Sequence, residues 1–135
     1  MFKSIVAVAL GAAIGAISRW LLGNALNPLF STFSAGILFA NLLGGFLIGI
    51  LLHIISIYPE ISTTWKLFLM TGLLGSLTTF SAFSAEIFTL LQSQRWGNAL
   101  LVALIHLLGS ILMTALGFIT ATYMRKLILS ILKIT

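Results

Sequence analysis

The chain has 135 residues, of which 60% are hydrophobic and 7% are charged. Soluble domains carry about 25% charged residues, so this chain cannot cover a water-facing surface and is predicted to be built for lipid. Its net charge of +5 comes from seven basic residues and two acidic ones. The basic residues are scattered along the sequence, which excludes a basic patch for nucleic acid. The sequence has no cysteine, which excludes disulfides, thiolate metal sites and thiol nucleophiles.

Four apolar stretches predict four transmembrane helices and leave no length for a second domain. Each crossing needs about 20 apolar residues, and the stretches lie at roughly 5–22, 36–57, 66–91 and 99–123. The third is long for one straight span. Aromatic rings that favour the headgroup level fall near the predicted ends, at Trp20, Tyr58, Trp65, Trp96 and Tyr123. We therefore expect residues 1–135 to form one all-α membrane domain.

The first stretch is long enough to span and lacks the polar break that follows a signal-peptide cleavage site, so we interpret it as a helix. Gly11 and Gly15 have the spacing of a close-packing helix face, and similar small-residue pairs recur at 40/44 and 45/49. Such faces serve packing within the chain or self-association. Arg19, near the end of the stretch, either extends to the interface or has a functional role.

The second stretch contains one amide, Asn41, in its middle. Its NH₂ group could donate hydrogen bonds to an anion. The alternative is an interhelical hydrogen bond, which contributes about 0.6 kcal/mol on average. His53, near the end of the stretch, is assigned no role.

The third stretch places glycines and hydroxyls where hydrophobicity should peak, between Gly72 and Glu86. Glycine permits unusual backbone angles, and Ser or Thr can bond backbone groups freed by an interruption, so we predict a break at residues 75–79. Free carbonyl oxygens there would suit a hard cation, and amide hydrogens an anion. The alternative is a Ser/Thr-rich kink that only packs.

Phe80 and Phe83 follow the predicted break and flank Ser81 on one helix face. The positive edges of their rings could receive an anion, although two phenylalanines alone more often pack or contact lipid. Glu86 lies further along the same stretch. Three interpretations are open for it: a proton site, a partner for a cation, or an acid at the membrane interface.

The fourth stretch carries a polar stripe at four-residue spacing, formed by His106, Ser110 and Thr114. Such a stripe implies a polar partner or a water-lined path, although His106 alone would be more typical of a packing histidine. No phosphate loop, nucleophile elbow or metal-ligand spacing is present in the sequence, so we do not expect an enzyme. Both termini are predicted to lie in the cytoplasm, because more of the basic residues fall on that side of the predicted spans: Lys3, Lys66, Arg125, Lys126 and Lys133.

Three segments together resemble the Fluc (CrcB-type) fluoride channels of microbes: residues 11–20, 41–49 and 75–84. The last, with Thr78-Thr79-Phe80-Ser81-Ala82-Phe83-Ser84, is the most specific, and the helix count and spacing agree over essentially the whole chain. The sequence departs from the family pattern at Trp20, Ser76 and Ala82. Ala82 removes a hydroxyl between the paired rings and puts a direct role for that position in doubt.

The resemblance implies an antiparallel, dual-topology homodimer in the lipid of the cell inner (plasma) membrane, with two fluoride pores along its interface. It also implies one structural sodium ion, held by the backbone carbonyls of Gly75 and Thr78. For fluoride it implicates Asn41, Phe80, Phe83 and Ser110, with Ser81 nearby and His106 and Thr114 extending the polar track.

The implied function is a fluoride-selective channel that exports cytoplasmic fluoride and gives fluoride resistance. A negative-inside potential drives an anion outwards with about 2.3 kcal/mol per 100 mV. The rival interpretation is a small multidrug-resistance-type four-helix dimeric transporter, for which Glu86 would be the membrane-embedded acid. A third is a non-conducting assembly or helper protein, which needs packing faces but no broken helix.

Overall fold

The computed structural model describes residues 1–30 and 33–132, and every regular element within them is helical. Four helical segments are long and apolar enough to cross a membrane. The elements are α1 (Phe2–Leu26), η1 (Asn27–Leu29), α2 (Ala35–Ile57), α3 (Thr63–Lys66), η2 (Leu67–Leu74), α4 (Gly75–Leu77), α5 (Phe80–Gln92) and α6 (Trp96–Leu132). The third segment is composed of α3, η2, α4 and α5, and η2 has the wider turns of a π-helix.

The helices run past the apolar stretches expected from the sequence, most of all α6, which continues to Leu132 instead of ending near residue 123. The charged pair Arg125 and Lys126 limits a hydrophobic span but does not stop a helix, because both residues are good helix formers. Leucines and isoleucines follow them, so the backbone remains helical.

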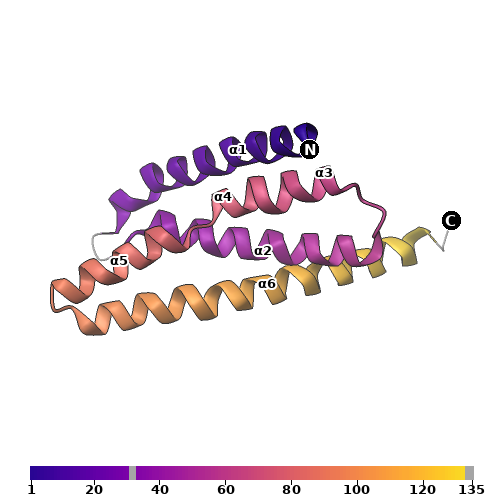
Figure 1. Ribbon diagram of the computed structural model, residues 1–135. Coiled ribbons are helices and arrows are strands. Elements are labelled where there is room, and N and C mark those ends of the chain that lie inside the picture. The colour runs from indigo at the N-terminus through magenta and orange to yellow at the C-terminus, as the bar shows by residue number, and fades with distance from the viewer. Residues whose placement is uncertain (31–32, 133–135) are drawn as a thin grey trace.

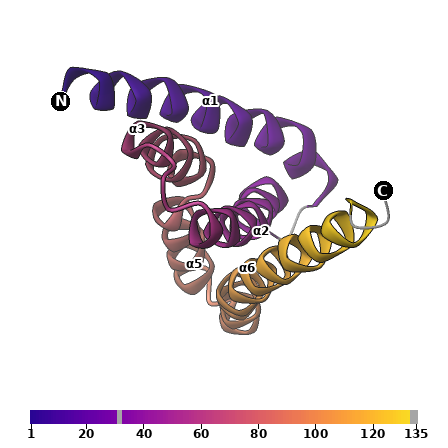
Figure 2. The same cartoon turned by 90° about the vertical axis from the view of Figure 1, so that its right-hand side faces the viewer.

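The third segment changes neighbours along its length. In its first half η2 and α4 pack against α1, whereas in its second half α5 packs against α6. Figure 1 shows the chain crossing α2 between α4 and α5. Viewed along the bundle, α1 lies on one side and the α5–α6 hairpin on the other, with α2 between them (Figure 2). The start of α1 and the end of α6 lie towards the same end of the bundle (Figure 1).

Small residues allow the helix backbones to touch. A Cβ at Gly49 of α2 would lie 2.0 Å from the Thr114 carbonyl oxygen of α6, and a Cβ at Gly117 of α6 would lie 2.0 Å from the Phe46 carbonyl oxygen of α2. Gly11 and Gly15 of α1 do the same against the third segment: a Cβ at Gly11 would lie 2.4 Å from the Phe68 oxygen, and one at Gly15 would lie 2.1 Å from the Leu73 oxygen. The expected close packing is thus confirmed within the chain.

Large apolar side chains cover the outside of the molecule, while the buried core is small. The core around α2 and the third segment consists of Ala40, Leu51, Leu74 and Leu77. Exposed large side chains on α6 include Leu100, Leu107, Ile111, Leu112 and Ile119. An apolar exterior of this extent suits lipid or another membrane-embedded chain, so the chain is a multi-pass membrane protein.

Candidate functional site

The helical backbone stops at Leu77 and restarts at Phe80. Between them Thr78 has φ −81° and ψ 156°, and Thr79 has φ −153° and ψ 123°, so both are extended. Threonine is β-branched and therefore favours this extended conformation. The hydroxyls also satisfy nearby backbone groups: Thr78 Oγ1 donates to the Leu74 carbonyl (2.9 Å), and Thr79 Oγ1 accepts from the Ala82 N–H (3.2 Å) as the N-cap of α5.

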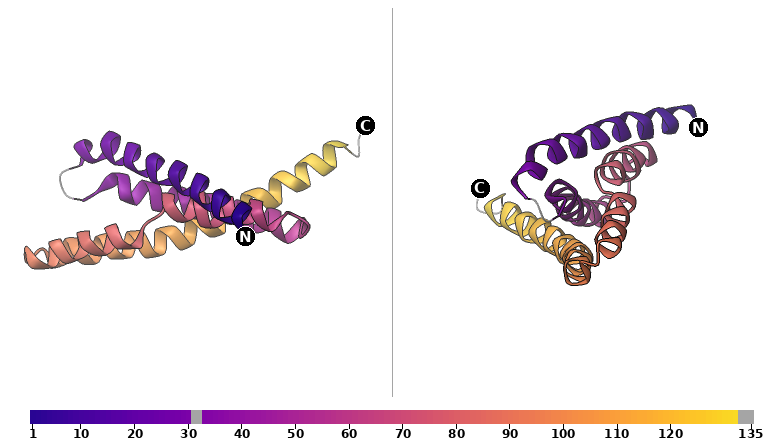
Figure 3. Two further views of the ribbon diagram at one scale, coloured as in Figure 1. Left: turned by 45° about the horizontal axis from the view of Figure 1, so that its top comes forward. Right: turned by 90° about the vertical axis from the view of Figure 1, so that its left-hand side faces the viewer.

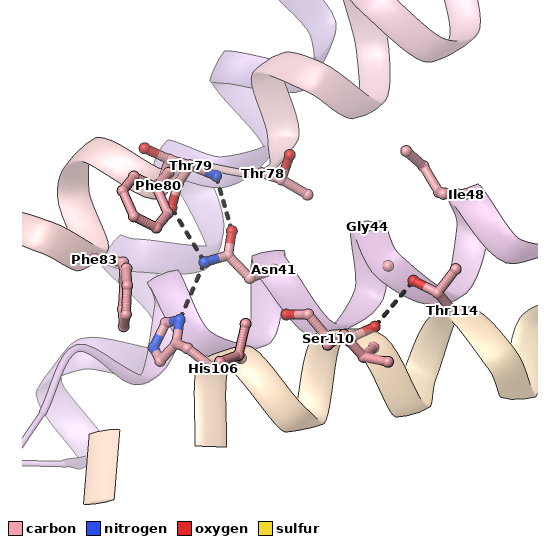
Figure 4. Close-up of a pocket in the computed structure, with 13 residues that line it drawn as sticks. Asn41, Gly44, Ile48, Thr78, Thr79, Phe80, Phe83, His106, Ser110 and Thr114 are labelled. Carbon is pink, nitrogen blue, oxygen red and sulfur yellow. Dashed lines mark hydrogen bonds between the residues drawn. The ribbon is translucent and has the colours of Figure 1, made fainter. Parts of the chain in front are cut away.

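Asn41 of α2 holds the extended residues in place. Its Oδ1 accepts from the Thr79 N–H at 2.8 Å, and its Nδ2 donates to the Thr79 carbonyl at 3.2 Å. The side-chain amide thus takes the place of a peptide group for Thr79. Nδ2 also lies 3.1 Å from Nδ1 of His106 on α6 (Figure 4). One side chain therefore joins the second, third and fourth segments.

Three carbonyl groups beside or within the extended residues, those of Gly75, Leu77 and Thr78, accept no hydrogen bond from any described residue. The Ser76 carbonyl accepts from Arg19 Nε at 3.1 Å, and the Thr79 carbonyl accepts from Asn41. No donor reaches the carbonyls of Gly75 and Thr78 in the described part of the chain. Gly75 is also exposed in the single chain. Free carbonyl oxygens in a membrane segment call for a ligand or a partner, because lipid offers no donor.

An open groove of about 350 Å³ lies beside the interruption. Figure 4 shows side chains from α2, from the start of α5 and from α6 around it. Six of the side chains singled out from the sequence for fluoride line it: Asn41, Phe80, Phe83, His106, Ser110 and Thr114. Ser81 does not line it, and its hydroxyl lies 3.1 Å from that of Thr79. Thr78 lines the groove, whereas Gly75 does not.

Three aromatic rings lie side by side in a row and cover one end of the groove. The centroids of Phe80 and Phe83 are 5.4 Å apart, and those of Phe83 and His106 are 4.8 Å apart with planes inclined by 31°. Phe83 thus lies over the imidazole, while Phe80 is 78% exposed at the open side. The ring edge of Phe80 is accessible to an ion or to a second chain.

The structure adds groove residues that the sequence did not single out for this role, among them Gly44 and Gly45 of α2. A Cβ at Gly44 would lie 2.2 Å from Thr78 Cγ2, and one at Gly45 would lie 2.9 Å from the Ser110 carbonyl oxygen. These glycines make room for the interrupted segment and for α6. Their position three and four residues after Asn41, on the same helix face, is the signal that could have indicated them.

Two of the four hydroxyl groups that line the groove have already donated their hydrogens. Thr114 Oγ1 donates to the Ser110 carbonyl at 2.9 Å and Thr78 Oγ1 to that of Leu74, so both present lone pairs to the groove. The Ser110 hydroxyl has no hydrogen-bond partner among the described residues. An anion needs donors, and the Ser110 hydroxyl offers one without rearrangement.

Three ionisable residues weighed from the sequence lie outside the groove. Arg19 bonds the Ser76 carbonyl. Glu86 Oε1 accepts from the backbone N–H of Ser34 at the N-terminus of α2, and its other oxygen is buried without a partner among residues 1–30 and 33–132. His53 is buried against α6, with Nδ1 3.1 Å from Thr122 Oγ1.

Comparison with known proteins places this geometry in a family. The model of a family described as "CrcB-like protein, Camphor Resistance (CrcB)" matches residues 6–118. A relative from Pasteurella multocida is 54% identical over 115 residues, covering 85% of this chain and 90% of its own. One from Marinobacter nauticus is 51% identical over 93% of this chain and 99% of its own, and one from Pseudomonas aeruginosa is 48% identical over 92% and 98%. All three are described as "Fluoride-specific ion channel FluC".

Proposed function

The chain belongs to the CrcB family of fluoride channels, and from that premise we propose that the groove beside Thr78 and Thr79 is one wall of its fluoride path. The protein is a channel and not an enzyme. The observation that carries the proposal is the convergence of Phe80, Phe83, His106 and Ser110 on one groove lined from three helices.

The groove suits a small, strongly hydrated anion. Such an ion gives up water only where donors replace it. The Ser110 hydroxyl and the edges of the phenyl rings provide partial positive charge without a fixed cation, which would bind the ion too tightly to release it. Arg19 and Lys66 do not line the groove.

A second copy of the chain closes the groove in this proposal. Phe80 is exposed in the single chain, and the Ser110 hydroxyl, which has no partner among the described residues, lies in an open groove. Unsatisfied polar groups in hydrocarbon cost several kcal/mol each, so the groove is unsuited to face lipid. The resemblance noted above points to an antiparallel homodimer of dual topology, with α3 to α5 acting as one interrupted crossing.

A sodium ion fits the carbonyls of Gly75 and Thr78. Na⁺ is a hard cation that prefers oxygen ligands, and unwound backbone carbonyls are a known type of site for it in membrane proteins. Both are among the carbonyls near the interruption that lack a donor in the described chain, and two chains would contribute two pairs. A bound cation would neutralise the negative ends of these carbonyl dipoles and hold two subunits together.

The direction of transport follows from the membrane potential. A channel in the cell inner membrane with negative-inside potential releases fluoride passively, driven by about 2.3 kcal/mol per 100 mV. The physiological consequence is fluoride resistance, with no need for a coupling ion.

Liposomes test the proposal. Vesicles containing the purified protein are loaded with potassium fluoride, a potassium ionophore is added, and external fluoride is followed with an electrode. We expect electrogenic fluoride efflux and no chloride efflux. Absence of fluoride efflux from vesicles with folded protein would refute the proposal.

Phe80→Ile in the same assay should slow efflux about tenfold, because an aromatic edge contact of about 1–1.5 kcal/mol corresponds to about that factor in rate. Phe88→Ile is the matched control. Phe88 lies on the same helix and is exposed, but it does not line the groove, so efflux through this variant should equal that of the wild type. Equal rates for both variants would contradict a role for the ring edge.

The multidrug transporter remains a second candidate only through Glu86. Its carboxylate bonds Ser34 at the end of α2 and lies outside the groove, which is unlike a central binding site. Efflux of fluoride without proton exchange would separate the channel from this rival.

A further inference from the structure

A second groove lies between the start of α1 and the start of the third segment, apart from the groove beside Thr78 and Thr79. It measures about 460 Å³, and the two grooves share no lining residue. Its lining is almost entirely carbon and includes the side chains of Phe2, Val6, Ala7, Leu10, Trp65 and Phe68. Such a lining offers few partners to water or to an ion, so the second groove suits an apolar occupant.

The close contact of α1 with η2 explains where the second groove begins. A Cβ at Gly11 would lie 2.4 Å from the Phe68 carbonyl oxygen, and a Cβ at Gly72 would lie 2.8 Å from that of Val8. The two backbones therefore touch at this level. The part of α1 on the N-terminal side of this contact has no glycine, and larger side chains hold the groove open there. Figures 1 and 2 show α3 beside the start of α1.

The second groove extends from the level of the lipid headgroups into the hydrocarbon layer. Lys3 lies in the first turn of α1 and Trp65 in α3, at the starts of the first and third membrane segments. Both residue types favour the membrane interface. From Lys3 to Leu10 the helix rises about 10 Å, which is about a third of a hydrocarbon layer of about 30 Å. The groove thus covers the depth of the upper part of an acyl chain.

The end of the molecule that carries the second groove is positively charged. The start of α1, α3 and the end of α6 lie towards this end (Figure 1) and bring Lys3, Lys66, Arg125 and Lys126, against the single acid Glu60 before α3. Among these four basic residues Lys3 alone lines the groove, and it has no hydrogen-bond or ion-pair partner within residues 1–30 and 33–132. An anionic headgroup would balance this charge, whereas a second copy of the same surface would add like charge.

We propose that the second groove binds one anionic phospholipid, with its phosphate beside the Lys3 ammonium and the upper part of one acyl chain in the groove. The methylene groups of Lys3 contribute to the carbon lining, and a long basic side chain of this kind keeps its charge at the headgroup level. Trp65 and Phe68 form one wall, with ring centroids 5.7 Å apart. A zwitterionic lipid would bind less well, because its headgroup brings a positive charge of its own. The site lies outside the groove proposed for fluoride.

The test is quenching of Trp65 fluorescence by lipids that are brominated in the upper part of their acyl chains. The full chain carries Trp20→Phe and Trp96→Phe, which removes the two tryptophans that do not line the second groove. This protein is reconstituted in phosphatidylcholine with a small fraction of brominated phosphatidylglycerol or brominated phosphatidylcholine. We expect phosphatidylglycerol to bind about fivefold more tightly at Trp65, the factor that one basic residue contributes near an anionic lipid surface.

Lys3→Gln should abolish this preference, because glutamine lacks the charge. Lys126→Gln is the matched control: it removes a positive charge from the same end of the molecule but does not line the second groove, so the preference should remain.

Equal quenching by the two lipids, or a preference that survives Lys3→Gln, would overturn the proposal. Quenching by neither lipid would show that a second copy covers the groove, and would overturn it as well. If the protein with one tryptophan does not fold, the difference in fluorescence between the wild type and Trp65→Phe gives the same signal of Trp65.

Discussion

Thr79 has three local roles in a single residue. Its extended backbone separates α4 from α5, its peptide group is paired with Asn41, and its hydroxyl caps α5 through the Ala82 N–H. The side chain thus stabilises the start of the helix that carries Phe80 and Phe83. Loss of the cap would loosen both rings.

Replacing Thr79 by valine, which has the same shape but no hydroxyl, should lower the free energy of unfolding by about 1 kcal/mol, the usual contribution of an N-cap. Reversible unfolding of detergent-solubilised protein measures this change. Thr79→Ser keeps the cap and serves as the control. A valine variant as stable as the serine variant would show that the Ala82 N–H is satisfied in another way.

At this scale the sequence indicated which side chains matter but not how their hydrogens are shared. The types of Asn41, His106, Ser110 and Thr114 predicted a polar cluster, and six of the chosen side chains do line one groove. For Asn41 the structure shows the interhelical hydrogen bond that the sequence left open as an alternative. Which atom donates a hydrogen bond to which depends on the distances between segments that are far apart in the sequence. The spacing of residues along the chain gives no information on those distances.

Among the elements, α2 is the centre of the molecule, because it packs against both α6 and the third segment. Glycines at regular spacing make this possible, and their pattern is visible in the sequence. The sequence does not show which helix each glycine face meets. The crossing of the third segment from α1 to α6 is equally a tertiary feature, since both of its halves are apolar.

Gly49→Ala should lower the free energy of unfolding by about 1–3 kcal/mol, the usual cost of overpacking, because its Cβ would lie 2.0 Å from the Thr114 carbonyl oxygen. A methyl group there must push α2 and α6 apart. Gly97→Ala is the control, since no atom of the described residues lies within 4 Å of its Cβ, and alanine should stabilise that helical position by about 0.5–1 kcal/mol. Equal shifts in unfolding for the two variants would contradict the close approach.

At the scale of the whole molecule, the proposed second copy would cover what the single chain leaves open. Its groove is open, and one of the free carbonyls, that of Gly75, belongs to an exposed residue. Sequence composition predicted the lipid environment and the four crossings, whereas it contains no information on what covers the open groove.

Sodium removal tests the carbonyl site at this scale. Exchange of Na⁺ for N-methyl-D-glucamine at equal ionic strength should lower the melting temperature and slow fluoride efflux, because a ligand at 100 times its Kd adds about 2.7 kcal/mol to the stability of the folded state. Choline is the control cation and should behave like N-methyl-D-glucamine. A melting temperature indifferent to Na⁺ would refute a structural sodium ion.

The length of α6 determines how the molecule fits bilayers of different thickness. Its 37 residues rise about 55 Å, whereas the hydrocarbon layer measures about 30 Å, and Figure 3 shows the C-terminal turns projecting past the other helices. The surplus carries Tyr123, Arg125 and Lys126, which favour the headgroup region. In a bilayer of longer acyl chains, α6 can tilt less or place one more of its turns in the hydrocarbon layer. The protein should therefore keep its fold in lipids of differing chain length.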